Sequence, residues 1–326
     1  MVKTILTIMK LITKSIFRIE QQLFIQHLFY CTERNVREKN LKFLKIAILG
    51  LPNVGKSTLV NTLARRMICP TSSKVHTTMH KAEVMYSEDE TQIVFMDTPG
   101  LITNYEMKKY NLQKTFQEDP KLSIQEADVV GIIQDVTNIY TRHRLSSFIV
   151  NQLKTKKDDA PLLLIFNKID KLKNKKVLLD LTTQLIKNEK LPKFDDVFMI
   201  SALSGDGVND LRNYLLDCAK ERDWQYSEDS YTDQSIETIV RETVRAKLLD
   251  HLPQDIPYMI QTKIEHFDIK DDGTATVSVL LECSQNYFKT ALLKNKGEMI
   301  KLIAIAVEKE LRHAFRTNIL VRLTVV

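Results

Sequence analysis

A glycine-rich segment provides the residue types best suited to binding a phosphate chain. It reads Gly50-Leu-Pro-Asn-Val-Gly55-Lys56-Ser57 and fits the spacing GxxxxGK[ST]. Glycines let backbone N–H groups turn towards phosphate oxygens, the Lys56 ammonium suits the β- and γ-phosphates, and the Ser57 hydroxyl is a magnesium ligand. A helix that begins here would add the positive end of its dipole. The predicted phosphate-binding residues are Gly50, Pro52, Asn53, Val54, Gly55, Lys56, Ser57 and Thr58.

A second candidate segment, Asp97-Thr98-Pro99-Gly100, follows the strand-like run 91–96. An aspartate at this strand end can hold Mg²⁺ through a water, and the Gly100 N–H could face the γ-phosphate. The next residue is Leu101, whose side chain cannot hydrogen-bond an attacking water. The sequence therefore predicts slow intrinsic hydrolysis.

A third segment, Asn167-Lys168-Ile-Asp170, follows the apolar run 160–166 and offers a way to select the base. The Asp170 carboxylate can accept from N1–H and the exocyclic amine of guanine, whereas adenine has neither donor, so an ATPase is disfavoured. Lys168 would cover the base and Asn167 would brace the loop. The small-residue loop Ser201-Ala202-Leu203 could contact the guanine carbonyl through its backbone. These residues predict GTP and GDP as ligands.

The polar segment 67–84 has no clear periodicity and is expected to be a switch loop. One threonine of the pair Thr77-Thr78 should cap Mg²⁺ when a γ-phosphate is present.

The elements that must position these residues are short apolar strands at 43–49, 91–96, 160–166 and 197–200. They indicate an α/β domain over 41–222 with a mostly parallel, doubly wound sheet. Residues 223–235 are acidic and polar and predict a linker. The remainder, 236–326, has the pattern helix, strand, strand, helix, loop, helix, strand, with Asp271-Asp272-Gly273 as a hairpin turn.

Composition agrees with two folded domains in a chain of 326 residues and 37.8 kDa. Hydrophobic residues are 44% and charged residues 27%, which excludes collagen, coiled coils and a disordered chain. No run of eighteen apolar residues exists, so no segment is expected to span a bilayer as a helix. The cysteines are far apart and without CxxC spacing, which disfavours a disulfide framework or a zinc site; they are Cys31, Cys69, Cys218 and Cys283.

Residues 1–40 differ from the rest of the chain in their charge. Over 1–31, Lys3, Lys10, Lys14 and Arg18 interleave with apolar residues, and Glu20 is the only acid. A basic, acid-poor amphipathic start is typical of a mitochondrial transit peptide, and an ordinary surface helix or a membrane-surface helix is the alternative. The predicted location is the mitochondrial matrix, and a peripheral contact with the inner membrane stays open.

Basic residues concentrate near the C-terminus, where the net charge of the whole chain, +6, has its largest local source. From 286 onward Glu298, Glu308 and Glu310 face eight cations, which are Lys289, Lys294, Lys296, Lys301, Lys309, Arg312, Arg316 and Arg322. Such a patch would attract phosphate backbones, although a solvated helix face explains the charge equally well.

The ordered motifs GLPNVGKS, TT, DTPG, NKID and SAL resemble the TrmE–Era branch of the translation-factor-type GTPases. The resemblance implies a six-stranded, mostly parallel sheet and hydrolysis of GTP to GDP and phosphate. It implies Thr78 as the magnesium-capping threonine, so that Lys56, Thr78, Asp97 and Gly100 are the catalytic candidates. Met79 replaces an arginine usual in the family. Asn53 resembles an asparagine with which some members bind K⁺, and a purely loop-bracing role is the alternative.

The C-terminal pattern resembles the type II KH domain of Era-type GTPases, on the segments RETVRAKLL, IPY and SQ…K and on KNKG (294–297) in the position of the GxxG loop. Such a loop clamps about four nucleotides of single-stranded RNA. The implied RNA contacts are Lys289, Lys294, Asn295, Lys296, Gly297 and Lys301. Lys294 replaces the first glycine, which would cost up to about 1–2 kcal/mol if that position needed a positive φ.

Together these resemblances, which cover 41–326, imply a mitochondrial GTPase that binds the 3′ region of small-subunit ribosomal RNA and assists assembly of that subunit. Two alternatives stay open. One is an RNA-binding scaffold that binds GTP with little hydrolysis, motivated by Leu101 and Met79. The other is a GTPase whose C-terminal domain binds a protein instead of RNA, motivated by Lys294.

Overall fold

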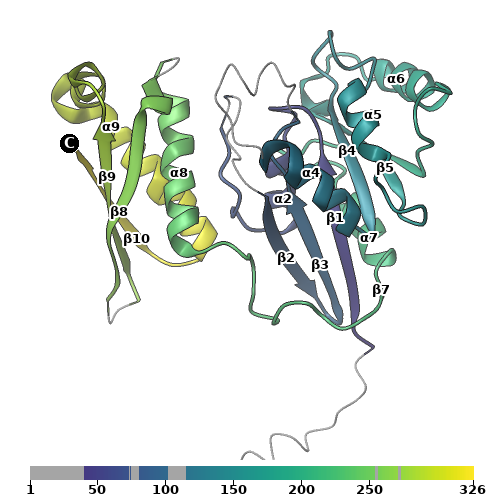
Figure 1. Ribbon diagram of the computed structural model, residues 1–326, viewed down its shortest axis with the longest axis horizontal. Helices are drawn as coiled ribbons and strands as arrows, with labels where there is room; N and C mark the ends of the chain where they lie inside the picture. Colours follow the sequence, from purple (N-terminus) through teal and green to yellow (C-terminus); the bar gives the residue numbers. More distant parts are fainter. Residues whose placement is uncertain (1–39, 73, 75–80, 102–114, 254–255, 271–272) are drawn as a thin grey trace, which may run out of the picture. The chain divides into compact units, whose positions relative to one another are not determined.

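The structure is a computed structural model that describes residues 40–326 except 73, 75–80, 102–114, 254–255 and 271–272 (Figure 1). The predicted transit peptide, Thr77, Thr78 and Met79 lie outside the described residues. Residues Leu41–Val326 form one compact unit. Within the described ranges, no helix combines the length and apolar character needed to cross a membrane.

The larger sheet has the strand order β2-β3-β1-β4-β5-β6 and is mostly parallel, as the sequence predicts (Figure 1). Only β2 and the two-residue β7 run antiparallel to their neighbours. The carboxyl ends of β1, β3, β4 and β5 therefore meet at one edge, where the loops with the candidate motifs begin. The strands are β1 (Lys42–Leu49), β2 (Ala82–Glu88), β3 (Thr91–Asp97), β4 (Val129–Asp135), β5 (Leu162–Asn167), β6 (Asp196–Met199) and β7 (Lys220–Glu221).

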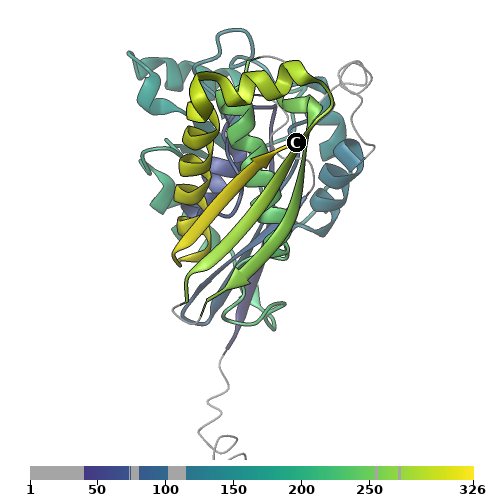
Figure 2. The same ribbon diagram turned by 90° about the vertical axis from the view of Figure 1, so that its left-hand side faces the viewer.

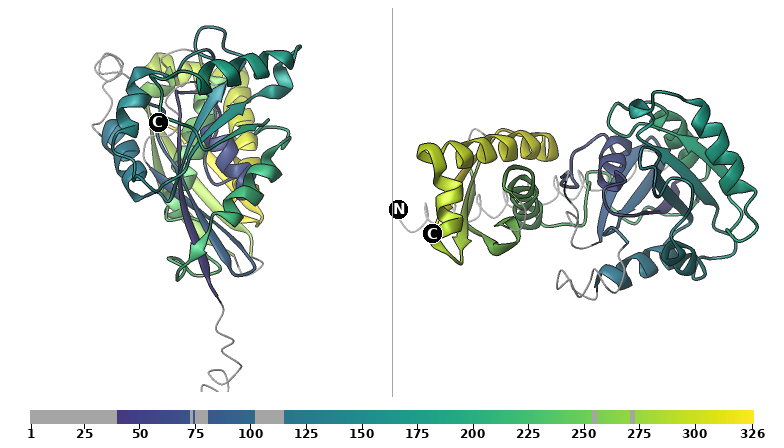
Figure 3. Two further views of the ribbon diagram at one scale, coloured as in Figure 1. Left: turned by 90° about the vertical axis from the view of Figure 1, so that its right-hand side faces the viewer. Right: turned by 90° about the horizontal axis from the view of Figure 1, so that it is seen from above.

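Helices cover both faces of this sheet, as the left panel of Figure 3 shows. Alternate residues of β1 point to opposite faces, so that Ile46 and Ile48 join one hydrophobic core while Ala47 and Leu49 join the other. On the first face lie α2 (Lys56–Leu63) and α7 (Val208–Asp217); on the second lie α4 (Thr115–Glu126), α5 (Ser147–Leu153) and α6 (Lys176–Ile186). This two-sided burial explains why the parallel strands are continuous apolar runs.

The C-terminal part is a three-stranded sheet, in the order β10-β9-β8, with two helices packed against it (Figure 2). Its elements are α8 (Ile236–His251), β8 (Ile260–Ile269), β9 (Ala275–Cys283), α9 (Asn286–Phe315) and β10 (Ile319–Val325). β8 and β9 form the predicted antiparallel hairpin, and β10 lies parallel to β9. Val277, Val279 and Leu281 of β9 form the core with the helices.

The expected loop between two helices differs from the structure, because α9 runs without a break from Asn286 to Phe315. A bend replaces the loop: Lys296 and Gly297 have φ of 57° and 83°, and Figure 2 shows two differently directed halves of the helix. Left-handed residues interrupt regular helical geometry, so the kink has a local backbone cause. The left-handed lysine that the structure describes in this bend is Lys296.

One other sequence-based expectation needs correction. Residues 82–84, expected in the switch loop, begin β2. The charged residue Glu83 makes this segment look like a loop in the sequence. In the structure the Glu83 carboxylate is buried, and it pairs with the ammonium groups of Lys45 and Lys81 at 3.1 Å each. The expected linker 223–235 contacts the sheet: the Tyr226 hydroxyl donates to Glu83 at 2.7 Å, and Trp224 Nε1 donates to a backbone oxygen at 3.1 Å.

Candidate functional site

The predicted phosphate loop connects β1 to α2 and is tightly packed. A Cβ on Gly50 would lie 2.7 Å from the Ile133 carbonyl oxygen, so that no larger residue fits. Gly55 has φ +101°, and a Cβ there would lie 2.4 Å from the Asn167 side-chain nitrogen. Both glycines of the motif are therefore required by the close approach of neighbouring segments, and Gly55 also by its backbone conformation.

Lys56 begins α2, and its ammonium folds back over the loop. Nζ donates to the carbonyl oxygens of Gly50 at 3.3 Å and Leu51 at 3.1 Å. Burial lowers the pKa of Lys56 to about 8, against the opposing effect of the Asp97 carboxylate. The loop thus holds a partly desolvated cation, whose charged form a phosphate chain would stabilise.

The oxygen atoms expected to hold Mg²⁺ lie together beside the loop. Ser57 Oγ donates to Asp97 Oδ2 at 2.7 Å, and the Thr98 hydroxyl fixes the end of β3 by donating to the Ile48 carbonyl at 2.9 Å. Hydroxyl and carboxylate oxygens are donors that Mg²⁺ prefers when phosphate oxygens and waters complete its shell. Among the described residues there is no cluster of three His, Cys, Asp or Glu that could hold a metal by itself. The donor set fits a magnesium ion brought with a nucleotide.

Leu101, which follows the DTPG segment, is 2% exposed and packs in the core. Its N–H donates to the Gly50 carbonyl at 3.1 Å, and a Cβ on the preceding Gly100 would lie 2.9 Å from the Pro52 Cα. The position after DTPG is thus fixed against the phosphate loop, and its side chain points away from any attacking water.

Asn167 braces three loops, as the sequence predicts. Its Nδ2 donates to the Val54 carbonyl at 2.8 Å, and its Oδ1 accepts from the Ala202 N–H at 2.9 Å. The Thr62 hydroxyl donates to the Ala202 carbonyl at 2.8 Å, which ties the same loop to α2. One buried amide therefore joins the phosphate loop to the two segments expected to contact the base.

Lys168 folds back onto the phosphate loop and the end of β4. It has φ 68°, and its Nζ donates to the Asn53 carbonyl at 2.6 Å and to Asp135 Oδ2 at 2.7 Å. Burial alone would raise the pKa of Asp135, but the hydrogen bonds from Lys168 and Thr137 lower it. Asp135, the last residue of β4, thus holds Lys168 in place, and the sequence motifs gave no indication of it.

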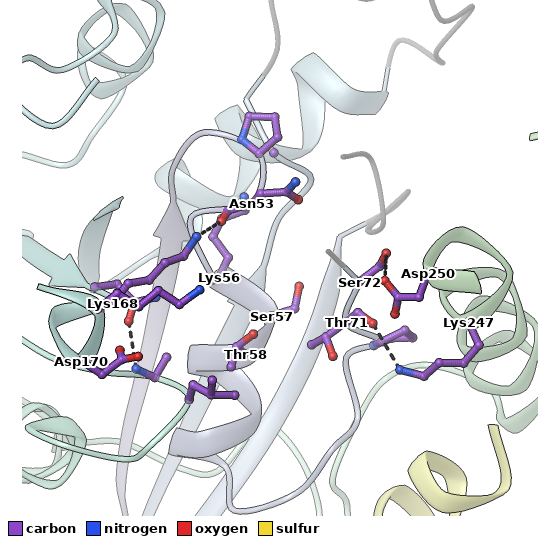
Figure 4. A pocket seen from close by; sticks show the side chains of 18 residues that line it. Asn53, Lys56, Ser57, Thr58, Thr71, Ser72, Lys168, Asp170, Lys247 and Asp250 are labelled. Atoms are coloured by element: carbon purple, nitrogen blue, oxygen red, sulfur yellow. Dashed lines mark hydrogen bonds between the residues drawn. The ribbon is translucent and has the colours of Figure 1, made fainter. Parts of the chain in front are cut away.

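A cavity of about 540 Å³ joins these groups, and Figure 4 shows its side chains. The predicted residues that line it are Pro52, Asn53, Gly55, Lys56, Ser57, Thr58, Gly100, Asn167, Lys168, Asp170, Ala202 and Leu203. Gly50, Val54, Asp97, Thr98 and Ser201 are not among its lining residues. The cavity therefore joins the phosphate-binding groups to Asp170, which is the arrangement a guanosine triphosphate requires.

The lining also includes residues that sequence reasoning missed, namely Pro70, Thr71, Ser72, Lys171, Lys247 and Asp250. The last two lie on α8. Ser72 Oγ donates to Asp250 at 2.8 Å, and Lys247 Nζ donates to the Thr71 carbonyl at 3.4 Å. Figure 4 marks both hydrogen bonds with dashed lines. No local motif signals these contacts, because the partners lie more than 170 positions apart in the chain.

Lys247 also pairs with Glu310 of α9, and the Thr71 N–H donates to the same carboxylate at 3.4 Å. Burial raises the pKa of Glu310, opposed by the Lys247 ammonium and this N–H. The N-terminal part of the expected switch loop is thus held by a buried ion pair of the C-terminal helices.

The predicted RNA contacts lie at and beside the bend of α9. Lys296 and Lys301 are exposed, and Lys289 and Gly297 are partly exposed. The side chains of Lys294 and Asn295 lie outside the described part of the chain. A cation at the bend and one a turn beyond it form a basic corner accessible to a phosphate backbone.

A phosphate loop and an NKxD segment around one cavity, with an aspartate at the end of β3 bonded to Ser57 of that loop, define a phosphate-loop GTPase, here with a smaller α+β unit at the C-terminus. The family model described as "50S ribosome-binding GTPase" matches residues 45–168. The GTPase Era, mitochondrial, of Danio rerio is 33% identical over 88% of this chain and 76% of its own length. GTPase Era of Glaesserella parasuis is 31% identical over 84% of this chain and 88% of its own.

The chain belongs to the Era family of GTPases. Its structure resembles the crystal structure of Era in complex with MgGDPNP and nucleotides 1506–1542 of 16S ribosomal RNA, with a TM-score of 0.75 and 28% identity over 87% of this chain and 93% of that one. Aquifex aeolicus Era bound to GDP and AlF₄⁻ matches with the same TM-score and coverage. The smaller sheet with α8 and α9 corresponds to the KH domain of Era.

Proposed function

We propose that this protein is a mitochondrial Era-type GTPase that binds small-subunit ribosomal RNA through its KH domain and assists assembly of the small ribosomal subunit. The observation that carries the proposal is one cavity in which Lys56, Ser57 and Asp170 can grip opposite ends of GTP, in a chain whose C-terminal unit corresponds to a KH domain. Support for the RNA comes from the relative bound to a 16S ribosomal RNA segment, and for the organelle from the mitochondrial relatives. The proposed boundaries are 41–222, 223–235 and 236–326.

Within the nucleotide site, the phosphate loop N–H groups and Lys56 bind the phosphates, and Ser57 and Thr78 would hold Mg²⁺ directly while Asp97 acts through a water. The ion supplies charge neutralisation at the β- and γ-phosphates when it is bound. Gly100 places its N–H near the γ-phosphate, and Asp170 selects guanine. Because Leu101 is buried, no side chain at that position orients the attacking water, which predicts slow unaided turnover. A purified protein that hydrolyses GTP several times per second without RNA would contradict this mechanism.

Asn53 is proposed as a K⁺ ligand, which would compensate transition-state charge in the absence of an arginine finger. It lines the cavity and has φ 60°, a conformation that glycine also adopts. Asn53→Gly therefore removes the side chain and keeps the backbone. We expect K⁺ to accelerate hydrolysis over Na⁺ at equal ionic strength in the natural protein and not in the variant. If K⁺ stimulates hydrolysis equally in the natural protein and in the variant, Asn53 only braces the loop.

RNA binding is tested by crosslinking in cells and mapping the crosslinked nucleotides. We expect sites in the 3′ region of small-subunit ribosomal RNA, lost in the variant Lys296→Glu, Lys301→Glu. If the protein crosslinks to RNA but shows no measurable single-turnover hydrolysis of GTP, even with K⁺ and RNA present, the scaffold alternative is favoured. Hydrolysis without RNA crosslinks would favour a protein partner for the C-terminal unit.

The matrix location is a proposal as well. After separation of mitochondria into soluble and membrane fractions, a matrix protein is recovered in the soluble fraction. Recovery on membranes that carbonate releases would instead indicate a peripheral contact with the inner membrane.

A further inference from the structure

A second basic surface lies on the GTPase part, beyond the base-reading end of the nucleotide cavity. β4 and β5 are parallel neighbours, with Asp135 opposite Asn167, and the Val136 N–H donates to the Asn167 carbonyl at 3.2 Å. The loop 136–146 and the segment 168–175 therefore leave the sheet side by side, and Figure 1 shows the carboxyl ends of both strands on the side of α5 and α6. The His143 ring also bonds Gln184 of α6 at 3.1 Å. We name Ile139, Tyr140, Arg142, Arg144, Lys171, Lys173, Lys175 and Lys176 the basic–aromatic surface.

The loop that carries Tyr140 is held in one conformation by buried and local hydrogen bonds. The side chain of buried Gln134 donates to the Thr141 carbonyl at 2.6 Å and to the Arg144 carbonyl at 3.2 Å. The Tyr140 N–H donates to Asn138 Oδ1 at 3.0 Å. Yet Ile139 and Tyr140 at the tip are 60% and 80% exposed. Because this loop is already ordered in the free protein, little conformational entropy would be lost when its exposed aromatic ring binds a partner.

The charge around this ring is strongly one-sided. Over 138–144 and 171–193 there are nine Lys and Arg against Asp180 and Glu189. None of these nine cations forms an ion pair with any residue that the structure describes; they are Arg142, Arg144, Lys171, Lys173, Lys175, Lys176, Lys187, Lys190 and Lys193. The excess of positive charge in these segments favours a polyanion.

The chemistry favours RNA over a protein partner. Lysine is depleted at protein–protein interfaces, whereas lysines and arginines that neutralise phosphates provide most of the affinity for a nucleic acid. An exposed tyrosine among such cations is the usual platform for an unstacked base. We propose that the basic–aromatic surface binds single-stranded RNA, with a base stacked on Tyr140 and backbone phosphates on Arg142, Arg144 and the lysines of 171–176. This site is separate from the KH unit and does not depend on it.

The test uses the full chain carrying Lys296→Glu and Lys301→Glu, which reverses the charge at two of the proposed KH contacts, and a fluorescein-labelled twelve-nucleotide poly(U) strand. Fluorescence anisotropy measures its affinity over a range of KCl concentrations. We expect residual salt-dependent binding in this background. Tyr140→Ala should weaken it about 5- to 100-fold through the lost base stacking. Arg142→Glu with Arg144→Glu should lower the slope of log affinity against log salt by about 1.4, since each lost contact of a single strand accounts for about 0.7.

Two controls separate a site from general charge. Lys121→Glu with Lys154→Glu makes the same change in net charge at exposed positions of α4 and beyond α5. An equal loss there would overturn the proposal. Leu179→Ser changes a 70% exposed apolar residue of α6 that lies outside the basic–aromatic surface. If Leu179→Ser weakens RNA binding and Tyr140→Ala does not, the proposal is also overturned. Retained GDP affinity in every variant shows that each is folded. Loss of all binding on Lys296→Glu and Lys301→Glu alone would support the KH proposal and refute the second site.

Discussion

Lys56 is the residue whose chemistry depends most directly on the geometry of the loop around it. Its ammonium is buried against two carbonyl oxygens, and its pKa falls to about 8. Below about pH 8, Lys56 of the nucleotide-free protein is charged. Burial of this charge lowers the free energy of unfolding, and the penalty decreases as the pH rises through the pKa and the lysine loses its proton. A bound triphosphate favours the charged form and raises its pKa. Binding should therefore take up a proton as the pH approaches and passes about 8.

GTP affinity should consequently be constant at pH values below the Lys56 pKa and fall above it, by at most about tenfold per pH unit. Calorimetry between pH 7 and 9 in two buffers of different ionisation enthalpy measures both the affinity and the proton uptake. Lys56→Arg is the control, because arginine stays charged over this range and should abolish the proton uptake. If the arginine variant shows the same decline, another group titrates, and the desolvated lysine is not the cause.

Asn167 makes a second prediction at this scale, because its amide satisfies two backbone groups of different loops. Asn167→Ala should leave the Val54 carbonyl and the Ala202 N–H without this partner and destabilise the protein by about 2–4 kcal/mol. GTP affinity should fall together with the melting temperature. Asn151→Ala, at an exposed position of α5, is the matched control and should change neither. A stable Asn167 variant with full affinity would show that the three loops hold their positions independently.

At the scale of elements, the bend of α9 places the basic corner of the KH unit. Lys296 has φ 57° and Gly297 has φ 83°, while the nearest atom to a Cβ on Gly297 would be Ile300 Cγ2 at an ordinary 3.6 Å. The cost of a side chain at either position is therefore backbone strain rather than a clash.

Lys296→Gly should stabilise the protein by up to about 1 kcal/mol in thermal unfolding, because it relieves the left-handed conformation. Lys294→Gly should destabilise it by about 1 kcal/mol, since that residue continues the helix. Removing Lys296 should still weaken RNA binding, so stability and affinity change in opposite directions. If Lys294→Gly instead stabilises the protein, the turn begins at position 294, where the GxxG pattern of KH loops has its first glycine.

The sequence predicts some of these elements and misses others, for physical reasons. β1, β3 and β5 are apolar runs directly before motifs, and their ends hold the residues expected to grip a nucleotide. β2 was missed in part because Glu83 reads as a loop residue until its pairing with Lys45 and Lys81 is known. Asp135 was missed because its role depends on the neighbouring strand. At 294–297 the sequence predicts a loop between two helices, and the structure has a bend within α9 at Lys296 and Gly297.

At the scale of the whole molecule, the N-terminal part of the expected switch loop contacts the C-terminal helices. Ser72 bonds Asp250, Lys247 reaches Thr71, and the Lys74 ammonium bonds the Leu252 carbonyl. We propose that GTP favours an RNA-competent arrangement of the two domains and that hydrolysis releases it. These contacts are a physical route by which the nucleotide state can bias that arrangement.

Ser72→Ala, Asp250→Ala and their combination test this route. With saturating nucleotide, the ratio of RNA affinities in the GDPNP and GDP states should move towards one by about fivefold in each variant, as expected for a hydrogen bond worth about 1 kcal/mol. The double variant should show less than the sum of the two single effects, because both substitutions remove the same bond. Asp268→Ala on the exposed face of β8 is the control and should keep the natural ratio. Additive effects would mean that the two residues act separately, and a ratio of one in the natural protein would refute the switch itself.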